Sequence, residues 1–273
     1  MLDVIVRRAP VFLLVAVRCF ALVMTLPLFS MRTVPRVAKV ALCGYMAYLI
    51  VPHVDFSTYD AFAALSGDGA FSLKYALLLL GEGMIGLVMG FYVSIIFAAF
   101  SAAGQFFAFQ MGFSASEVYD ALSQVENPLM GQYLNLVAML LFLQNSWVQL
   151  LFARTLVASF DSVTAFSLVA GRDGVVRTLL GGLSALFADA FIIAIPIMGT
   201  LLLVSVTMGV LSKAAPMMNL MSEGFPIMIL TAFFLVTSLM PQLCDFFTRS
   251  FVTGFAALER LLSSGAALVE GTL

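Results

Sequence analysis

Apolar positions fill most of the chain in six long stretches, separated by short segments that carry most of the polar residues. The stretches are Ala9–Met31, Val37–Val51, Tyr75–Ala103, Leu129–Phe160, Thr178–Leu211 and Phe225–Phe247. A helix that spans a bilayer needs roughly 20 apolar residues. Four stretches exceed that length, the sixth meets it and the second is short. The pattern therefore predicts an all-α integral membrane protein with about six apolar segments.

The last two stretches contain prolines that shape the expected helices. Thr178–Leu211 would be about 51 Å long as one helix, more than a bilayer requires. Pro196 lies near its middle, so we expect one bent helix or two half-helices. Pro216 and Pro226 bracket a short connection to the sixth stretch, and Gly224 can adopt a positive φ there. The fifth and sixth stretches should form an antiparallel hairpin.

Composition strengthens the membrane assignment and removes several classes of function. Hydrophobic residues make up 62% of the chain and charged residues 10%, with a mean hydropathy of +1.09. The net charge of −2 gives no basis for binding nucleic acid. His53 is the single histidine, and Cys19, Cys43 and Cys244 lie in apolar stretches without a Cys-x-x-Cys pair. We expect neither a metal nor another cofactor, and no catalytic motif indicates an enzyme.

A row of small residues follows Glu82 at four-residue spacing. Its members are Gly86, Gly90, Ser94, Ala98 and Ala102. Small side chains allow helix backbones to approach closely in a membrane, where lipid provides no hydrophobic drive for association. The row predicts an extensive helix–helix contact, within this chain or with a partner.

Among the ionisable residues in the apolar stretches, we single out Arg18, Glu82 and Asp189. Such groups are costly in a membrane unless they are paired, hydrated or near the interface. Glu82 is either a proton- or ion-linked carboxylate or a structural one, and we favour the structural role. Arg18 could pair with either carboxylate, and the sequence leaves the choice open.

The segment Gly104–Glu117 mixes Phe and Met with Gly and Ser, which makes it bulky, apolar and able to bend. One interpretation is an interfacial segment that lies on the membrane. The other is an apolar gate that closes a pore by excluding water. Composition does not decide between them.

The chain resembles the flagellar biosynthetic protein FliR family, with its counterparts in injection-type secretion systems, in three blocks that occur in the same order from about Val11 to Arg249. The first block is Arg18, Pro27–Phe29, Val34–Lys39 and Pro52; the second is Gly81–Glu82, Gly86, Gly90, Gln105, Gln110–Gly112 and Asn127–Pro128; the third is Pro196, Lys213, Pro216–Asn219 and Gly224–Pro226. Many relatives carry a glycine–histidine element where this chain reads Asn145–Gln149, so no role of that histidine carries over.

The resemblance implies a subunit of a type III export gate in the bacterial inner membrane, at the flagellar or secretion-system basal body. It implies a fold like a fusion of FliP and FliQ, in one membrane-embedded domain over residues 1–260 with a flexible tail at 261–273. FliP-like and FliQ-like subunits would complete a ring, much of which would be raised above the bilayer plane. FlhB-like and FlhA-like export proteins and membrane lipid would be further partners, and unfolded export substrates would pass through the ring. The flagellar system is favoured over the injection system.

The resemblance also assigns roles to residues. A plug loop would fall at Phe106–Tyr119, and the residues expected to close the channel are Phe106, Phe107, Phe109, Gln110, Met111, Gly112 and Phe113. The small-residue row would then press against neighbouring subunits. The alternative is a small secondary transporter that uses Glu82, Asp189 and Arg18 as coupling or substrate groups. Against it, the two halves of the chain show no convincing repeat.

Overall fold

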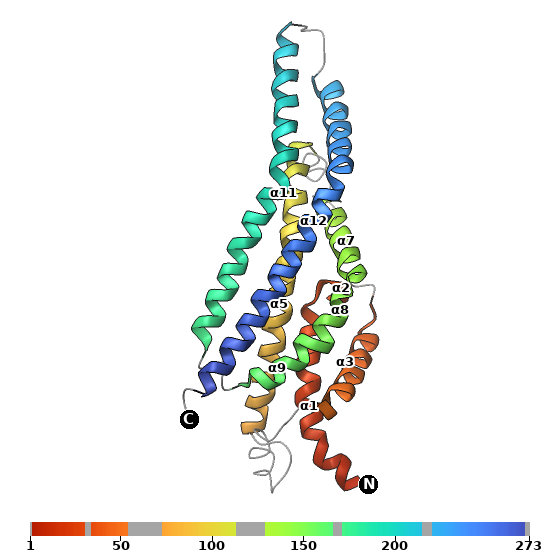
Figure 1. Cartoon of the computed structure of the whole chain (residues 1–273). Coiled ribbons are helices and arrows are strands. Elements are labelled where there is room, and N and C mark those ends of the chain that lie inside the picture. The colour runs from red at the N-terminus through yellow and green to blue at the C-terminus, as the bar shows by residue number, and fades with distance from the viewer. Residues whose placement is uncertain are drawn as a thin grey trace. The chain divides into compact units, whose positions relative to one another are not determined.

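The computed structural model describes residues 2–30, 34–53, 73–112, 129–165, 171–214 and 220–270, and Phe113 therefore lies outside it. Side chains are described within 9–29, 34–53, 73–112, 129–165, 171–214 and 223–262. Apart from short turns and connections, these ranges are helical and contain no strands, as expected for an all-α membrane protein (Figure 1).

The helices occur in the following order. They are α1 (Leu2–Thr25), α2 (Pro27–Ser30), α3 (Arg36–Ile50), the 3₁₀ turn η1 (Val51–His53), α5 (Leu73–Gln110), α7 (Leu129–Gln144), α8 (Trp147–Gln149), the π-helical turn η3 (Leu150–Leu156), α9 (Val157–Ser162), α11 (Arg172–Ala214) and α12 (Leu220–Glu270). Three of them, α5, α11 and most of α12, are long and apolar enough to cross a membrane. The pair Leu129–Gln144 and Trp147–Ser162 would add a fourth as a broken span.

The chain divides into two compact units. Unit 1 contains Met1–Ser94, Asn145–Gly182 and Gly254–Leu273, and unit 2 contains Ile95–Gln144 and Leu183–Thr253. Each unit therefore combines segments that are distant in the sequence.

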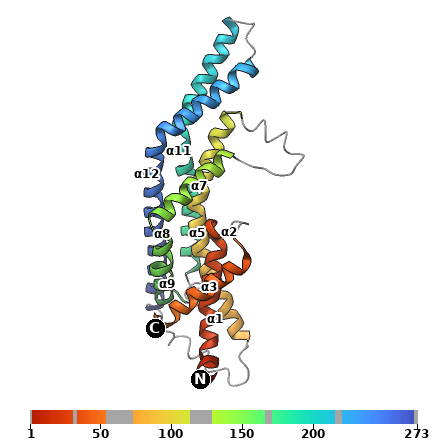
Figure 2. The ribbon, with the colours of Figure 1, turned by 90° about the vertical axis from the view of Figure 1, so that its right-hand side faces the viewer.

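Unit 1 is built on α1, against which both α3 and the first part of α5 pack (Figure 2). Tyr75 donates a hydrogen bond of 2.8 Å from its hydroxyl to the carbonyl oxygen of Pro10. Leu14, Leu78 and Ala165 are buried in the same cluster as Tyr75. The start of α5 is thus fixed to the middle of α1 by one polar contact and a small apolar core.

Unit 2 has a core of phenylalanine rings. The rings of Phe100 and Phe247 lie 3.9 Å apart between centroids, and those of Phe97 and Phe251 lie 4.9 Å apart, both edge to face. Phe142 of α7 completes the group, 5.4 Å from Phe251. Edge-to-face contacts are favourable because the positive ring edge meets the negative ring face. The core therefore joins α5, α7 and α12 without ionic groups.

Within unit 2, α11 and α12 form the expected antiparallel hairpin. Ser250, late in α12, donates to Asp189, early in α11, at 2.9 Å, whereas Ser205 and Met228 pair at 3.1 Å nearer the connection. The views in Figures 1 and 2 show the two ribbons side by side.

Two alternatives were expected for the fifth stretch, one bent helix or two half-helices. The single helix is the one that occurs, because α11 is continuous through Pro196. A proline removes one N–H donor and frees one carbonyl, and a long helix keeps its other hydrogen bonds. The last helix, α12, is helical to Glu270 and so includes most of the segment 261–273 for which a flexible tail is expected.

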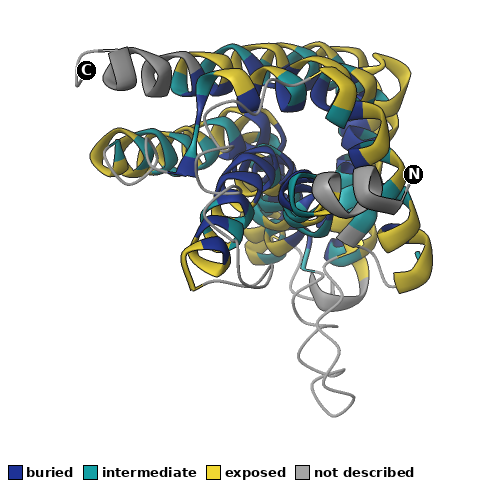
Figure 3. Ribbon diagram, turned by 90° about the horizontal axis from the view of Figure 1, so that it is seen from below, coloured by how far each residue is buried: buried dark blue, intermediate teal, exposed yellow. Residues whose placement is uncertain are grey.

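Much of the apolar surface of α11 and α12 is not buried within the chain. Only 28% of the most apolar 18-residue part of α11 and 17% of that of α12 is buried, compared with 61% in α5. Figure 3 shows buried positions on one side of individual helices and exposed positions on the other. Large apolar surfaces of this kind are covered by lipid or by partner proteins.

Candidate functional site

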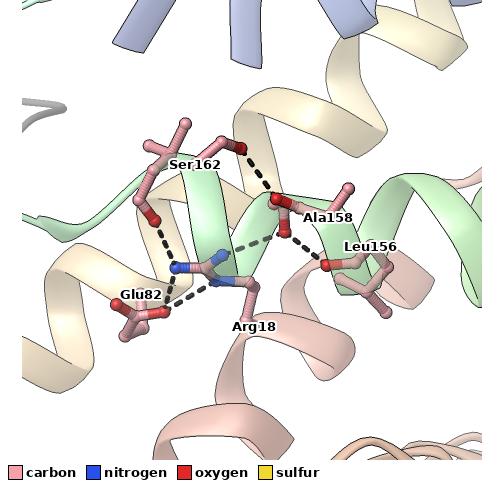
Figure 4. A network of polar contacts seen from close by, with 7 residues as sticks. Arg18, Glu82, Leu156, Ala158 and Ser162 are labelled. Carbon is pink, nitrogen blue, oxygen red and sulfur yellow. Dashed lines mark hydrogen bonds and ion pairs between the residues drawn. The ribbon is translucent and has the colours of Figure 1, made fainter. Parts of the chain in front are cut away.

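Arg18 lies at the centre of a buried polar network that joins three helices of unit 1 (Figure 4). Its Nε donates to Oε2 of Glu82 on α5 at 2.7 Å, and its Nη2 lies 2.5 Å from the same oxygen. Its Nη1 donates to the hydroxyl of Ser159 on α9 at 2.9 Å. The side chains of Arg18 and Glu82 are 0% and 1% exposed, so this ion pair is shielded from solvent.

The end of α9 completes the environment of the guanidinium. The Nη2 of Arg18 also donates to the carbonyl oxygen of Val163, at 3.0 Å. Val163 is extended, at φ −130° and ψ 118°, and follows the last turn of α9, where carbonyl groups lack partners within the helix. The ring of Phe160 lies against the guanidinium, with its centroid 3.9 Å from Cζ. A cation over an aromatic face is stabilised further by the ring quadrupole.

The small residues of α5 make this ion pair geometrically possible. A Cβ at Gly86 would collide with the carbonyl oxygen of Arg18, so the backbones of α1 and α5 touch there. Glu82 precedes Gly86 by about one turn on the same side of α5. Close approach at Gly86 therefore places the carboxylate beside the guanidinium.

The same contact continues towards the end of α1. A Cβ at Gly90 would collide with the hydroxyl of Thr25, and the hydroxyl of Ser94 donates to the carbonyl oxygen of Thr25 at 2.6 Å. Three members of the small-residue row thus pack within the chain.

The last two members of the row lie on a different side of the helix. Residues four apart on a 3.6-residue helix rotate by about 40°, so Ala98 has turned about 120° from Gly86. Ala98 is exposed and Ala102 is half-buried. The row therefore winds around α5 and does not keep to one face of the helix. Of the residues expected to contact neighbouring subunits, Ala98 and Ala102 remain open to such a contact.

Asp189 is not brought to Arg18. Its Oδ2 accepts a hydrogen bond from Ser250 within the α11–α12 hairpin, and its side chain is half-buried. The two carboxylates considered as partners of Arg18 thus belong to different units. Among the residues that the structure describes, no cluster of three His, Cys, Asp or Glu side chains could hold a metal ion.

The residues expected to close a channel lie at the end of α5. The helix continues through Gln110, so Phe106–Gln110 are helical, whereas a bendable segment had been expected from Gly104 onwards. Phe107 and Met111 are buried at 0% and 1% exposure, whereas Phe109 is 72% exposed. The chain turns at Gly112, two residues beyond the end of α5, with a φ of +84° that favours glycine.

Several contacting residues were not singled out from the sequence. Ser159, Phe160 and Val163 had no distinguishing pattern, because their role depends on where α9 meets α1. Gly104 and Gly131 mark a second backbone contact, between α5 and α7, where a Cβ on Gly104 would lie 2.7 Å from the Cα of Gly131. Both are small residues, Gly131 in the fourth apolar stretch and Gly104 directly after the third, but Gly104 lies outside the four-residue row.

The Asn145–Gln149 segment, where the chain departs from the resemblance, coincides with the break between α7 and α8. Ser146 has a φ of +57°, the one positive value at a non-glycine residue in the described part of the chain. The seven-residue π-helical turn η3 begins at Leu150. Trp147 is buried, with its ring 6.2 Å from that of Phe255.

Comparisons of the sequence with known proteins identify the family of this chain. The family model for bacterial export proteins, family 1, matches residues 9–254. The chain is 30% identical to the flagellar biosynthetic protein FliR of Bacillus subtilis (strain 168) over 236 residues, 86% of this chain and 88% of that protein. It is 27% identical to FliR of Escherichia coli (strain K12) over 247 residues, 90% of each. The surface presentation of antigens protein SpaR of Shigella sonnei is 31% identical over 170 residues, 62% of this chain and 64% of SpaR. This chain belongs to the family of bacterial export proteins, family 1, which includes FliR.

Proposed function

We propose that this chain is a subunit of the inner-membrane export gate of a flagellar type III secretion system. It would form part of the channel for unfolded export substrates, together with FliP-like and FliQ-like subunits and near FlhB-like and FlhA-like proteins. Its family membership supports a role in export, and the uncovered apolar surfaces of α11 and α12 are suited to lipid and to neighbouring subunits.

The end of α5 is the observation that carries the gating part of the proposal. A long apolar helix ends in buried Phe107 and Met111, presents the exposed ring of Phe109 and then turns at Gly112. Bulky apolar side chains at a constriction keep it dry and so exclude ions. Phe106 to Phe113 would form this closure, with no covalent chemistry performed by the chain.

The transporter alternative is not favoured by the geometry of its candidate groups. Glu82 is held by two guanidinium nitrogens of Arg18 and is removed from solvent. A proton-coupling carboxylate must exchange protons with water on each side of the membrane in turn. The buried Arg18–Glu82 ion pair is better suited to holding α1 and α5 together.

Deletion of Phe109–Phe113 in the complete export gate tests the proposal. We expect the deletion to raise the resting ion conductance of cells that express all gate subunits. A milder variant, Phe109→Ser, should raise it less, because one apolar ring is lost. The matched control is Phe187→Ser, which removes another exposed phenylalanine of unit 2, on α11. Unchanged conductance after the deletion, with the gate assembled, would contradict the gating role.

A further inference from the structure

An apolar pocket of about 490 Å³ lies within unit 1, between two helical faces. One wall belongs to α3 and the turn η1, and it consists of Met46, Leu49, Ile50 and His53. These positions follow the i, i+3, i+4, i+7 spacing of a single helix face. The wall is therefore apolar along its length and carries one polar side chain, that of His53, at its end.

The facing wall is formed by α8, η3 and α9, and it consists of Gln149, Phe152, Ala153 and Val157. The ring of Phe152 is held by Phe29, with the two centroids 6.2 Å apart in an edge-to-face arrangement. Ala153 contributes only a methyl group to this wall, which leaves space in front of it. Two of the lining residues lie in the π-helical turn η3, and such turns are rare and occur preferentially at functional sites.

An apolar pocket of this size is costly to leave empty. Folded proteins contain few voids larger than a water molecule, because the atoms that line a void lose their contacts. Water is a poor occupant, since a buried water needs about two to four hydrogen-bonding partners. Among the lining side chains only His53 and Gln149 can hydrogen-bond. The suitable occupant is therefore apolar along most of its length and polar at one end.

The volume indicates the size of that occupant. An apolar cavity of about 150 Å³ binds one benzene ring. This pocket is about three times as large and so offers space for roughly 18 carbon atoms at the same density. That is the size of one acyl chain of a membrane phospholipid.

We propose that the pocket binds one acyl chain of a phospholipid, with the headgroup end of the lipid held at His53 and Gln149. Nδ1 of His53 pairs with the carbonyl oxygen of Leu49 at 2.9 Å. Because a carbonyl oxygen only accepts hydrogen bonds, Nδ1 carries the proton, and Nε2 of the neutral ring can accept from a headgroup ammonium or hydroxyl group. The side-chain amide of Gln149 can donate to a phosphate or ester oxygen.

The outer surface of α3 supports lipid as the occupant. Tyr45 and Tyr48 are exposed on this helix, and tyrosine is enriched where a bilayer meets water. With 15 residues, α3 is too short to span a bilayer. Leu49 is exposed beside these rings and also lines the pocket, so the apolar surface of α3 continues into it. This continuity gives an acyl chain a route from the membrane into the pocket.

The test is photo-crosslinking of the full chain in vesicles of phosphatidylethanolamine and phosphatidylglycerol. A small fraction of the lipid carries a diazirine in its acyl chain, and the labelled residues are mapped by mass spectrometry. Ile50 and Phe152 line the pocket but are only 4% and 6% exposed, so lipid reaches them through the pocket. We expect label on both, and on the exposed Tyr48 as a positive control. Label on Tyr48 with none on Ile50 and Phe152 would overturn the proposal.

Filling the pocket separates specific binding from general lipid contact. The ring added by Ala153→Phe displaces at least two methylene groups of the acyl chain, which lowers the affinity by about tenfold. We expect the label on Ile50 to fall by about that factor and the label on Tyr48 to stay. Ala158→Phe is the matched control, because Ala158 is exposed on α9 outside the lining. Equal labelling of Ile50 in the two variants would contradict the proposal. Should Ala153→Phe misfold, Val157→Phe fills the same wall with the same expected result.

The headgroup position is tested by the double variant His53→Ala with Gln149→Ala. Each lost hydrogen bond lowers the affinity by about two- to tenfold, so we expect at least that loss of label on Ile50 and Phe152. Gln144→Ala, at an exposed position on α7, is the control. Unchanged labelling in the double variant would contradict a headgroup held at the two polar side chains.

The competing occupant is an apolar side chain of a partner protein. The same crosslinking is therefore repeated with the chain assembled with its FliP-like and FliQ-like neighbours. Label on Ile50 and Phe152 that persists in the assembly supports a bound lipid, whereas loss of both labels on assembly would overturn it in favour of a partner side chain. The lipid site concerns unit 1 and does not depend on the gating role proposed for the end of α5.

Discussion

The two units of the chain are stabilised by different kinds of contact. In unit 1 a fully buried arginine binds Glu82, Ser159 and Val163, and thereby fixes α1, α5 and the end of α9. In unit 2 the corresponding place is taken by the phenylalanine core of α5, α7 and α12. Directional hydrogen bonds with buried charge demand one geometry, whereas aromatic packing tolerates small rearrangements. Unit 1 is therefore suited to a fixed support and unit 2 to the part that carries the proposed gate.

The largest effect is expected from Arg18→Met. Removing the guanidinium leaves Glu82 buried without its cation, which destabilises a protein by about 3–5 kcal/mol. The measurement is the free energy of unfolding of the purified chain in detergent micelles. The double variant Arg18→Met with Glu82→Leu should recover much of the loss, because both buried charges are then absent. Equal instability of the single and double variants would contradict the assignment of an ion pair.

A smaller loss is expected from Gly86→Ala, which tests the backbone contact between α1 and α5. The added methyl group would collide with the carbonyl oxygen of Arg18, and overpacking of this kind costs about 1–3 kcal/mol. Gly44→Ala on α3 is the matched control, since a Cβ there meets no atom within 4 Å. The same unfolding titration should show Gly44→Ala unchanged or more stable. Similar losses at both positions would refute a specific contact at Gly86.

Phe251→Leu should lower the free energy of unfolding less than Arg18→Met does, which would sharpen the contrast between the two units. Leucine keeps most of the apolar volume and loses the ring contacts with Phe97 and Phe142, a cost of about 1 kcal/mol. Phe234→Leu, at an exposed position, should change stability by less than about 0.5 kcal/mol. A loss at Phe251 as large as that of Arg18→Met would mean that the aromatic core is as demanding as the ion pair.

The smallest effect concerns Ser146, between α7 and α8. A left-handed conformation costs a non-glycine residue about 1–2 kcal/mol. Glycine avoids this cost but recovers only part of it as stability, because it also makes the unfolded chain more flexible. Ser146→Gly should therefore raise the free energy of unfolding slightly, by about 0.5 kcal/mol. Ser146→Val, which adds a branched side chain at the same φ of +57°, should lower it. The reverse order would show that the serine side chain stabilises the break.

Much of the helical architecture could be predicted because its signals are local. Long apolar stretches specify membrane helices, and Pro216 with Pro226 marks the α11–α12 hairpin. Pro196 could have bent or divided α11 and does not divide it, and Pro226 lies inside α12 and not in the connection before it. The sequence analysis predicts shorter helices than α5 and α12 prove to be. Polar residues and glycine lower helix propensity, but tertiary packing can still keep such residues helical.

The candidate site was predictable in its charged members and unpredictable in their partners. Charges within apolar stretches must be paired, which identifies Arg18 and Glu82. The Ser159 hydroxyl comes from a segment 141 residues away, and no periodicity links it to Arg18. The contact of Gly112 with Phe225 likewise depends on how α12 returns to the end of α5. Such pairings arise from tertiary packing, which a single sequence does not specify.

The measurement that tests the central claim most directly is the native mass and composition of this chain, affinity-tagged and purified in detergent after co-expression with its FliP-like and FliQ-like neighbours. We predict a single large particle that contains all three proteins. A lone monomer or dimer, with the neighbours left behind, would contradict the assignment as an export-gate subunit and return attention to the transporter alternative.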